Sequence, residues 1–477
     1  MKPLTGHTVL ASSLVLWGCT VGPNFQSPAA PAPNSYTRDT LPASTDAAGT
    51  TQTFIHADNA LPMWWTQFGS DALNRLVDTA LQHSPTLAQA QARLTEAHEN
   101  YVAEAGATEY PAIDASLSAT RQKVDLSSFG ITTVPSPGPF TILNASLSVS
   151  YALDIFGGNR RTLEGLMAEV NYEAYELEAA RLSLAGNVVA NAILHASLQQ
   201  QIDLTERLAD TQAHQLSIID RRFAAGGVSE LDVHSQRTLL AQTRATLPPL
   251  STQLARADHQ LAILLGMTPS EADFHDVTLD SLHLPATVPL TLPSTLARER
   301  PDIRASEALL HQASANIGVA TANLYPQFAI SAGIGSERTR IADVLNGLNI
   351  WNIGLNLTQP LFHGGELRAK RRAAQADYEA ALAGYRQTVL QALQQVADAL
   401  HALNNDARAL SERSDAQREA QASLTIAQAQ YAAGGVSQFS LLDTQRSALQ
   451  TALDQSRAQA DRLSDTATLF QSLGRAW

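Results

Sequence analysis

The stretch FAAGGVSELDVHSQRT, which starts at Phe223, returns later in the chain as YAAGGVSQFSLLDTQRS, starting at Tyr431. The first seven positions agree apart from Phe in place of Tyr. A Gly-Gly pair interrupts a helix, and a serine two residues later is a favoured N-cap. In the first copy Asp232 follows Ser229 at the spacing of a capping box. Each copy therefore predicts a turn between two helices.

Two further landmarks precede the turn in each copy, in the same order, which indicates that the whole chain is duplicated. One is a helical pattern that runs on to a Tyr-Pro pair, and the other is a short apolar segment followed by Gly-Gly. Alanine-rich helices can resemble each other by chance at one site, but hardly at three. The paired segments are HSPTLAQAQARLTEA from His83 with ERPDIRASEALLHQA from Glu299, the pairs at Tyr110 and Tyr325, and LDIFGGNRR from Leu153 with PLFHGGELRAKRR from Pro360.

The duplication divides the chain into five parts. We expect a signal peptide over 1–18, an extended segment over 19–64, a first repeat over 65–270, a linker over 271–293 and a second repeat over 294–477.

The amino terminus carries an export signal. Lys2 is followed by an apolar stretch from Val9 to Trp17, and Gly18 precedes the chain's single cysteine, Cys19. About ten apolar residues are too few to span a bilayer, which needs roughly 20. The cysteine is either incidental or the acylated first residue of a mature lipoprotein. An exported chain with one thiol cannot form an internal disulfide, which favours acylation of Cys19.

Each repeat begins with an amphipathic helix, expected over Asp71–Ala107 and over Leu296–Asn323. Two strand-like segments follow, and then two long helical stretches that meet at the Gly-Gly turn. Apolar residues recur every seven positions in the long helices, a spacing that predicts left-handed coiled-coil packing. The recurring residues are Leu163, Val170, Leu177 and Leu184 in the first repeat, and Leu382, Val389, Val396, Leu403 and Leu410 in the second.

The strand-like segments alternate between apolar and small polar residues. LNASLSVSYALDI from Leu143 does so throughout, as do the stretches that begin at Ala112, Phe328 and Trp351. Such alternation marks any half-buried sheet as well as a membrane barrel, but long loops rich in Gly, Ser and Pro join the paired strands. Four strands per chain cannot close a barrel, because the smallest barrels have about eight. Two, three or four copies would supply 8, 12 or 16 strands.

Composition excludes several classes of function. The net charge of −13 and the pI of about 5.4 argue against a nucleic-acid partner. The sequence has no GxxxxGK[ST] loop, and its 13 histidines are scattered without the spacing of metal ligands. We therefore expect no enzyme activity, no metal, and no cofactor other than a covalent lipid on Cys19.

These motifs together make the sequence similar to the TolC-type outer-membrane factor family, in its lipoprotein branch that serves resistance–nodulation–division efflux pumps. The resemblance rests on CTVGPNFQSP at Cys19, WWTQFGSDALNRLVDTAL at Trp64, LDIFGG, PLFHGGELR, and the Tyr-Pro and Gly-Gly sites. It implies a mainly α protein with a transmembrane β-barrel part: a homotrimer with a 12-stranded barrel and a 12-helix periplasmic coiled-coil tunnel. The linker would lie in an equatorial region around that tunnel.

The same resemblance implies a function and partners. The chain would be the passive outer-membrane exit duct of a tripartite efflux system, lipid-anchored in the outer membrane and extending into the periplasm. Its partners would be outer-membrane lipid, a periplasmic adaptor and an inner-membrane pump, and its cargo drugs or other small toxic compounds. Two alternatives stay open at this point, a structural coiled-coil lipoprotein of the envelope and an enzyme on an elongated scaffold.

The resemblance also assigns roles to residues near the turns. Phe439 and Asp443 are four apart on one helical face and match the family's apolar and acidic rings at a periplasmic gate, with Arg446 one turn further. Three such carboxylates near one axis would attract cations. The adaptor would dock on the two turns, at Gly226, Gly227, Val228 and Ser229 and at Gly434, Gly435, Val436 and Ser437.

Overall fold

The structure is a computed structural model that describes residues 20–29, 33, 35–38, 42–56, 63–271, 273–344 and 346–474. The chain forms two compact units. The first unit contains the described residues up to Ser27 together with Thr95–Asn171 and Ala308–Ala383, and the second contains the remaining described residues. Each unit takes segments from both repeats, so neither repeat folds as a separate domain.

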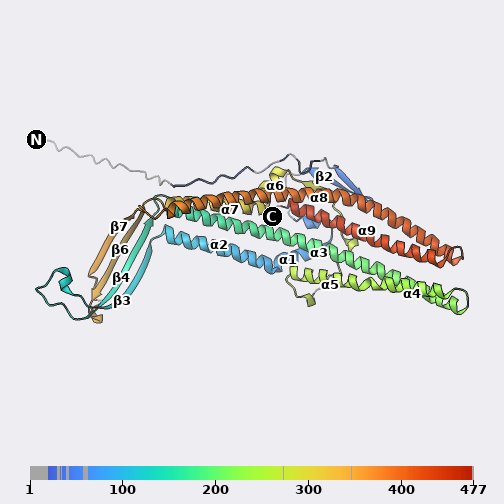
Figure 1. Cartoon of the computed structure of the whole chain (residues 1–477), viewed down its shortest axis with the longest axis horizontal. Coiled ribbons are helices and arrows are strands. Elements are labelled where there is room, and N and C mark those ends of the chain that lie inside the picture. The colour runs from blue at the N-terminus through green and yellow to red at the C-terminus, as the bar shows by residue number, and fades with distance from the viewer. Residues whose placement is uncertain are drawn as a thin grey trace, which may run out of the picture. The chain divides into compact units, whose positions relative to one another are not determined.

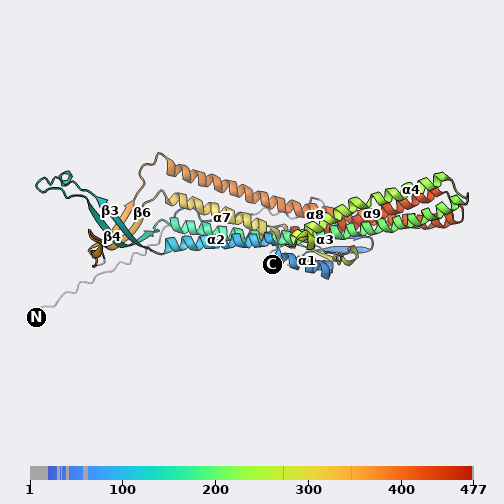
Figure 2. The ribbon, with the colours of Figure 1, turned by 90° about the horizontal axis from the view of Figure 1, so that it is seen from below.

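A four-stranded antiparallel sheet, in the order β3-β4-β6-β7, forms one part of the first unit (Figure 1). All four strands agree with the alternation in the sequence. The connection between β3 and β4 contains a short helix, η2 (Leu126–Phe129), and reaches beyond the sheet (Figure 2). The strand bounds are β3 Ala112–Gln122, β4 Phe140–Leu153, β6 Gln327–Arg338 and β7 Ile350–Thr358, and η5 (Ile341–Asp343) lies between β6 and β7.

The second unit contains a small sheet that the alternation in the sequence did not predict. Its order is β1-β2-β5, and β2 pairs parallel with β5. Part of the segment expected to be extended and part of the expected linker therefore lie side by side. The bounds are β1 Ser44–Ala47, β2 Thr50–His56 and β5 Thr287–Leu290, with η3 (Pro269–Glu271) and η4 (Leu279–Ser281) before β5.

The long helices α3 (Gly158–Ala224) and α8 (Glu366–Ala432) have 67 residues each, which is about 100 Å of helix. In the second repeat the chain returns through one helix, α9 (Gln438–Leu473). In the first repeat the expected single return helix is divided into α4 (Glu230–Ala245) and α5 (Leu247–Leu264), where prolines follow Leu247. No helix in the described part of the chain is long and apolar enough to cross a membrane.

The seven-residue pattern of α8 faces its neighbours as predicted. Val389, Val396, Leu403 and Leu410 are all buried, and a second buried series lies three or four residues away from them. This is the two-position seam of a coiled coil.

The helix expected at the start of each repeat is interrupted in both copies, which corrects the two continuous helices of the sequence analysis. The breaks come at Ser84 and Arg300, each directly before a proline, and both residues have extended backbone (ψ 123° and 128°). A proline ring disfavours the helical conformation of the residue before it. The resulting helices are α1 Asp71–His83 and α2 Pro85–Glu109, and α6 Pro293–Glu299 and α7 Pro301–Ala322.

Aromatic side chains form the centre of the core of the second unit. Trp64, Trp65 and Phe68 of η1 (Trp64–Phe68) are almost fully buried. The ring of Trp64 stacks on that of Phe470 from α9, with 5.8 Å between centroids. Aromatic side chains bury the largest apolar areas. Because Trp64 lies at the start of the first repeat and Phe470 near the end of the second, this cluster packs the two ends of the chain together.

Candidate functional sites at the helix turns and on the sheet

The two Gly-Gly turns have the same backbone geometry. Gly226 and Gly434 have positive φ angles, +73° and +76°, which a residue with a Cβ adopts only at a cost. The amide of Gly227 donates to Arg222 O and that of Gly435 to Gln430 O, both at 2.8 Å. These bonds satisfy carbonyls at the end of α3 and of α8, as in a Schellman motif. The repeated sequence therefore specifies one repeated turn.

The predicted N-caps are confirmed in both copies. Ser229 Oγ accepts from the amide of Asp232 at 3.2 Å, and the Asp232 carboxylate accepts from the amide of Ser229 at 3.0 Å, so the capping box is complete. Ser437 Oγ accepts from the amide of Ser440 at 3.2 Å. The second turn thus has an N-cap but no acidic partner for it.

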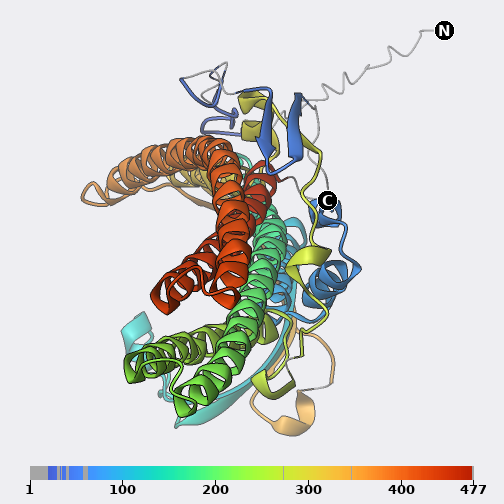
Figure 3. The same ribbon diagram turned by 90° about the vertical axis from the view of Figure 1, so that its right-hand side faces the viewer.

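The residues expected to receive an adaptor lie together at the two turns. The four glycines and both cap serines are exposed, while Val228 and Val436 are half-buried. Figure 3 shows the α3–α4 and α8–α9 pairs side by side in the second unit. The turns therefore offer small exposed groups around a partly covered valine in each copy.

Buried glutamines, which the sequence analysis missed, join the two helix pairs behind the turns. Gln438 Nε2 donates to Gln236 Oε1 at 2.9 Å, and Gln236 Nε2 donates to Gln212 O at 3.1 Å. Gln445 Nε2 donates to Gln215 Oε1 at 2.5 Å. Buried amide groups that pair in this way hold one register of the helices, because any shift leaves them unpaired. The sequence feature that points to these buried glutamines is the Gln-Arg pair that both repeats carry after the turn.

The three expected gate residues lie on the first turns of α9. Phe439 is 79% exposed. Asp443 Oδ1 accepts from Arg446 Nη2 at 2.7 Å, and both side chains are largely exposed. The structure therefore brings the acid and the base together on one helix and leaves the aromatic ring uncovered beside them.

The register of the four-stranded sheet sorts its side chains by polarity. Leu147 lies opposite Ile334, and Ile334 lies opposite Trp351, so the apolar positions of adjacent strands share one face. The other face carries small polar groups, and the hydroxyls of Ser116 and Ser146 are 2.9 Å apart. The sheet thus has one largely apolar face and one face of small polar side chains. The polar face also carries the carboxylate of Asp114, in one row with Ser148, Gly333 and Asn352.

The apolar face of the sheet is exposed, and so are its edges. Trp351, Ile353, Leu355 and Leu357 of β7 are 60–79% exposed. Among the described residues, the outer edges of β3 and β7 pair with no other strand. Large exposed apolar patches mark sites that meet lipid or protein, and open strand edges invite pairing with another chain.

A buried arginine with acidic neighbours lies between α8, α9 and β1 in the second unit. Arg462 is fully buried, and its guanidinium donates to Leu403 O and to Thr45 Oγ1. Burial lowers the pKa of Arg462 to about 10, against the opposing effect of Asp406 and Asp465. Burial, together with the hydrogen bond and charge of Asp465, raises the pKa of Asp406 to about 7, although Arg462 opposes this shift.

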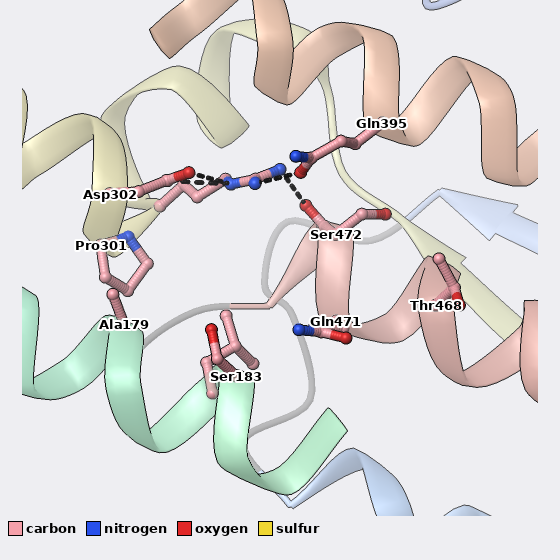
Figure 4. A pocket seen from close by; sticks show the side chains of 10 residues that line it. Ala179, Ser183, Pro301, Asp302, Gln395, Thr468, Gln471 and Ser472 are labelled. Atoms are coloured by element: carbon pink, nitrogen blue, oxygen red, sulfur yellow. Dashed lines mark hydrogen bonds and ion pairs between the residues drawn. The ribbon is translucent and has the colours of Figure 1, made fainter. Parts of the chain in front are cut away.

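A second arginine stabilises the break between α6 and α7 (Figure 4). Arg300 Nε donates to both carboxylate oxygens of Asp302 at 2.9 and 3.1 Å, and Nη1 donates to Ser472 O at 3.0 Å. Nη2 donates to Gln395 Oε1. The cavity beside it, about 280 Å³, therefore presents a guanidinium in which each of the three nitrogens already donates a hydrogen bond.

Comparison with known protein families shows to which family this chain belongs. The family described as outer membrane efflux protein matches residues 76–267 and 292–475. The chain belongs to this family. It is therefore an outer-membrane efflux protein, in agreement with the resemblance drawn from its motifs.

Individual relatives cover nearly the whole chain. The pyoverdine export outer membrane protein OpmQ of Pseudomonas aeruginosa is 32% identical over 418 residues, 87% of each chain. The toluene efflux pump outer membrane protein TtgI of Pseudomonas putida is 29% identical over 468 residues, 97% of each chain. The solved structure of the outer-membrane channel OprN is 28% identical, with a TM-score of 0.85 over 96% of this chain and 100% of that one.

Two expectations concern residues other than the turns and the sheet. Cys19, expected to carry the lipid, lies outside the described residues. Within the described part of the chain, no group of three or more His, Cys, Asp or Glu side chains is placed to hold a metal ion. His195 Nδ1 instead lies 2.6 Å from Asp258 Oδ1, and His311 Nε2 lies 2.9 Å from Glu164 Oε1.

Proposed function

We propose that three copies of this outer-membrane efflux protein form the passive exit duct of a tripartite efflux system. The four-stranded sheet, with its apolar face, its small polar face and its two open edges, carries the proposal. In hydrocarbon each unpaired backbone group costs several kcal/mol, so a membrane sheet has to close on itself. Four strands are too few, and three copies supply 12.

The two faces suit the two sides of such a barrel. The apolar residues of β3, β4, β6 and β7 would meet lipid, and the serine, asparagine and glycine residues of the opposite face would line a water-filled lumen. Twelve long helical stretches from the three copies would continue the barrel as a coiled-coil tunnel in the periplasm.

Partner proteins would drive transport through this duct. We assign the adaptor's contact to the two turns, Gly226–Ser229 and Gly434–Ser437, because they expose small groups that an incoming helical hairpin can approach closely. The energy would come from an inner-membrane resistance–nodulation–division pump. Phe439, Asp443 and Arg446 would narrow the periplasmic end when no pump is engaged.

The cargo would be small organic compounds delivered by the pump. OpmQ is named for pyoverdine export and TtgI for toluene efflux, so relatives at this level of identity serve very different compounds. A lumen lined mainly by small polar side chains suits this variety, because it offers few groups that could recognise one particular compound. We propose that the pump, and not this chain, selects the cargo.

A covalent lipid on Cys19 would anchor the amino terminus in the outer membrane. In Cys19→Ser, incorporation of labelled palmitate should vanish. The duct should still assemble, because a barrel of many strands holds the membrane more firmly than acyl chains do. Persistent lipid labelling of Cys19→Ser would refute acylation at this residue.

Neighbouring residues of β7 provide the test of the duct. Ile353 lies on the apolar face and Asn352 on the polar face. A lysine facing lipid costs about 2–4 kcal/mol near the middle of the bilayer, whereas a lysine in the lumen mainly changes selectivity. We expect Ile353→Lys to abolish trimers in outer-membrane extracts and to restore no drug resistance in a deletion strain. The matched variant Asn352→Lys should form trimers, and equal behaviour of the two variants would contradict the proposal.

A further inference from the structure

Four cations lie at the loop end of the four-stranded sheet, where β3 connects to β4 and β6 connects to β7. Arg121 is the last residue but one of β3, and Arg338 is the last residue of β6. Lys123 and Arg340 each follow two residues later. Arg121, Lys123 and Arg340 are exposed, and Arg338 is half-buried. Lys123 and Arg338 each come 13 residues after the tyrosine of a Tyr-Pro pair, so both repeats place a cation at this distance from the shared landmark.

The register of the sheet places both arginines on its apolar face. Arg338 lies opposite Leu143 of β4. Leu143 in turn lies opposite Ala119 of β3, two residues before Arg121. Because side chains two residues apart on a strand point to the same face, Arg121, Leu143 and Arg338 share the apolar face. The apolar face therefore ends in a pair of guanidinium groups.

The nearby acids do not neutralise these cations. Glu337 lies on the polar face of the sheet, by the same alternation. In the connecting loops, Asp125 accepts from Ser136 Oγ at 2.8 Å, and Asp343 accepts from Asn346 Nδ2 at 3.0 Å. In the part of the chain that the structure describes, none of the four cations forms an ion pair. A chain with a net charge of −13 thus has a local excess of positive charge at this end of the sheet.

The length of the apolar face places the two arginines at a membrane boundary. On β4 this face runs from Leu153 to Leu143, which are ten positions apart. Ten positions span about 34 Å along a strand, or about 26 Å along the membrane normal at the ~40° tilt of a barrel strand. The apolar band of a membrane barrel is about 25 Å tall. Arg338, in register with Leu143, would therefore lie where the hydrocarbon ends, and Arg121 would lie one step beyond it.

We propose that Arg121, Lys123, Arg338 and Arg340 form a binding surface for lipid A, the phosphorylated and acylated disaccharide of lipopolysaccharide in the outer leaflet. A guanidinium binds a phosphate through two parallel hydrogen bonds. Two strand spacings and one step of two residues put the Cα atoms of Arg121 and Arg338 about 12 Å apart. Lipid A carries a phosphate at each end of its disaccharide and can therefore reach both arginines, while its acyl chains lie along the apolar face.

The loop end faces the outer leaflet if the sheet inserts as part of the proposed barrel, on which this inference rests. The other ends of the four strands adjoin α2, α3, α7 and α8, which the proposed duct places toward the periplasm. A glycerophospholipid in the same leaflet has one phosphate between its acyl chains and its headgroup, which suits one arginine and not two at this separation. The pair of arginines therefore favours lipid A over other anionic lipids.

Native mass spectrometry of the intact trimer in detergent tests this surface, with lipid A added and with EDTA present so that divalent cations form no bridges. We expect the wild type to retain lipid A and Arg121→Ala/Arg338→Ala to bind it more weakly by about tenfold or more. Arg368→Ala/Arg372→Ala is the matched control, because it removes the same charge from exposed arginines of α8, beyond the opposite end of β7. A wild type that retains no lipid A, or equal loss in both double variants, would overturn the proposal.

Altered lipids identify the group that the arginines bind. Lipid A without its phosphates should bind the wild type as weakly as intact lipid A binds Arg121→Ala/Arg338→Ala. Phosphatidylglycerol, with its single phosphate, should be displaced by lipid A. If phosphatidylglycerol binds as tightly as lipid A, the surface is a general one for anionic lipids and the assignment to lipid A is wrong.

Conductance separates this proposal from the one on which it rests. Both arginines lie on the face opposite the proposed lumen, so Arg121→Ala/Arg338→Ala should form trimers and give conductance steps of wild-type size in planar bilayers. If the double variant forms no trimers, Arg121→Gln and Arg338→Gln serve singly, and each should weaken the binding of lipid A. A wild type that conducts but retains no lipid A would refute the lipid surface alone, whereas a wild type without discrete conductance would refute the duct.

Discussion

The two repeats share one turn but differ after it. Both end a 67-residue helix in a glycine of positive φ and start the next helix at a serine. In the first repeat a capping box follows, and the return path is divided after 16 residues. In the second repeat α9 runs unbroken for 36 residues. The repeated local sequence therefore determines the backbone of the turn, while the residues that follow it determine which side chains surround each turn.

The difference concentrates the proposed gate in the second repeat. At the spacing of the repeats, Phe439 corresponds to Leu231 and Asp443 to Ser235. Leu231 and Phe439 are similarly exposed, at 74% and 79%. At these two positions the first repeat lacks the aromatic ring and the acid, and its nearby Asp232 is engaged in the capping box with Ser229. The gate's ring of charge from the three copies would therefore come from the second turn.

The largest effect should come from the buried arginine of the second repeat. Arg462→Ala removes the buried donor to Leu403 O and Thr45 Oγ1 and the cation near Asp406 and Asp465. Each buried acceptor left unpaired costs about 1–3 kcal/mol. The arginines of α4 and α5 are exposed, and Arg244→Ala is the matched control in the first repeat. Thermal unfolding in detergent should show a much lower midpoint for Arg462→Ala only. Equal midpoints would mean that this contact does not distinguish the repeats.

The docking proposal predicts that the two turns behave alike. Tryptophan in place of Val228 or Val436 would block the approach of a partner to a half-buried contact, and loss of one such contact corresponds to about tenfold weaker binding. Efflux should fall in both variants at unchanged protein level, whereas Val→Ile variants should be close to wild type. Normal drug resistance in both tryptophan variants would exclude docking at the turns, and loss in one variant alone would assign docking to one repeat.

A smaller effect, dependent on pH, should come from Asp406. Its pKa in the folded state is raised to about 7, above the ordinary value of 3.8, so the protonated form is favoured by folding. Stability from this group is complete below about pH 4 and is lost as the pH rises through 7. Asp406→Asn should therefore gain about 1 kcal/mol over wild type between pH 5 and 8, a value reduced by solvent at this half-buried carboxyl. A constant difference across that range would contradict the raised pKa.

Much of the fold could be predicted because its signals are local. The turns and N-caps follow from four adjacent residues, and the strands follow from a period of two. The breaks at Ser84 and Arg300 were also visible, since Pro85 and Pro301 occupy matching places in the two repeats. At both places the restriction that a proline imposes on the residue before it outweighs the helical periodicity.

Other features depend on contacts between distant segments. The pairing of β2 with β5 joins residues more than 200 apart in sequence, and no local pattern specifies it. No local sequence pattern distinguishes Arg462 from the exposed arginines, because its buried environment includes Thr45 of β1, which is distant in sequence. The buried glutamines belong to the same class, since an amide on a helix face is buried only when a neighbouring helix covers it.

Single-channel recording in planar lipid bilayers tests the account most directly. The wild-type protein should give discrete conductance steps of small size, because the second turn narrows the duct. Phe439→Ala/Asp443→Ala should give clearly larger steps, and the matched variant Leu231→Ala/Ser235→Ala should give steps of wild-type size. The absence of discrete conductance from all three proteins would contradict the duct itself, and equal conductance of all three would contradict a gate in the second repeat.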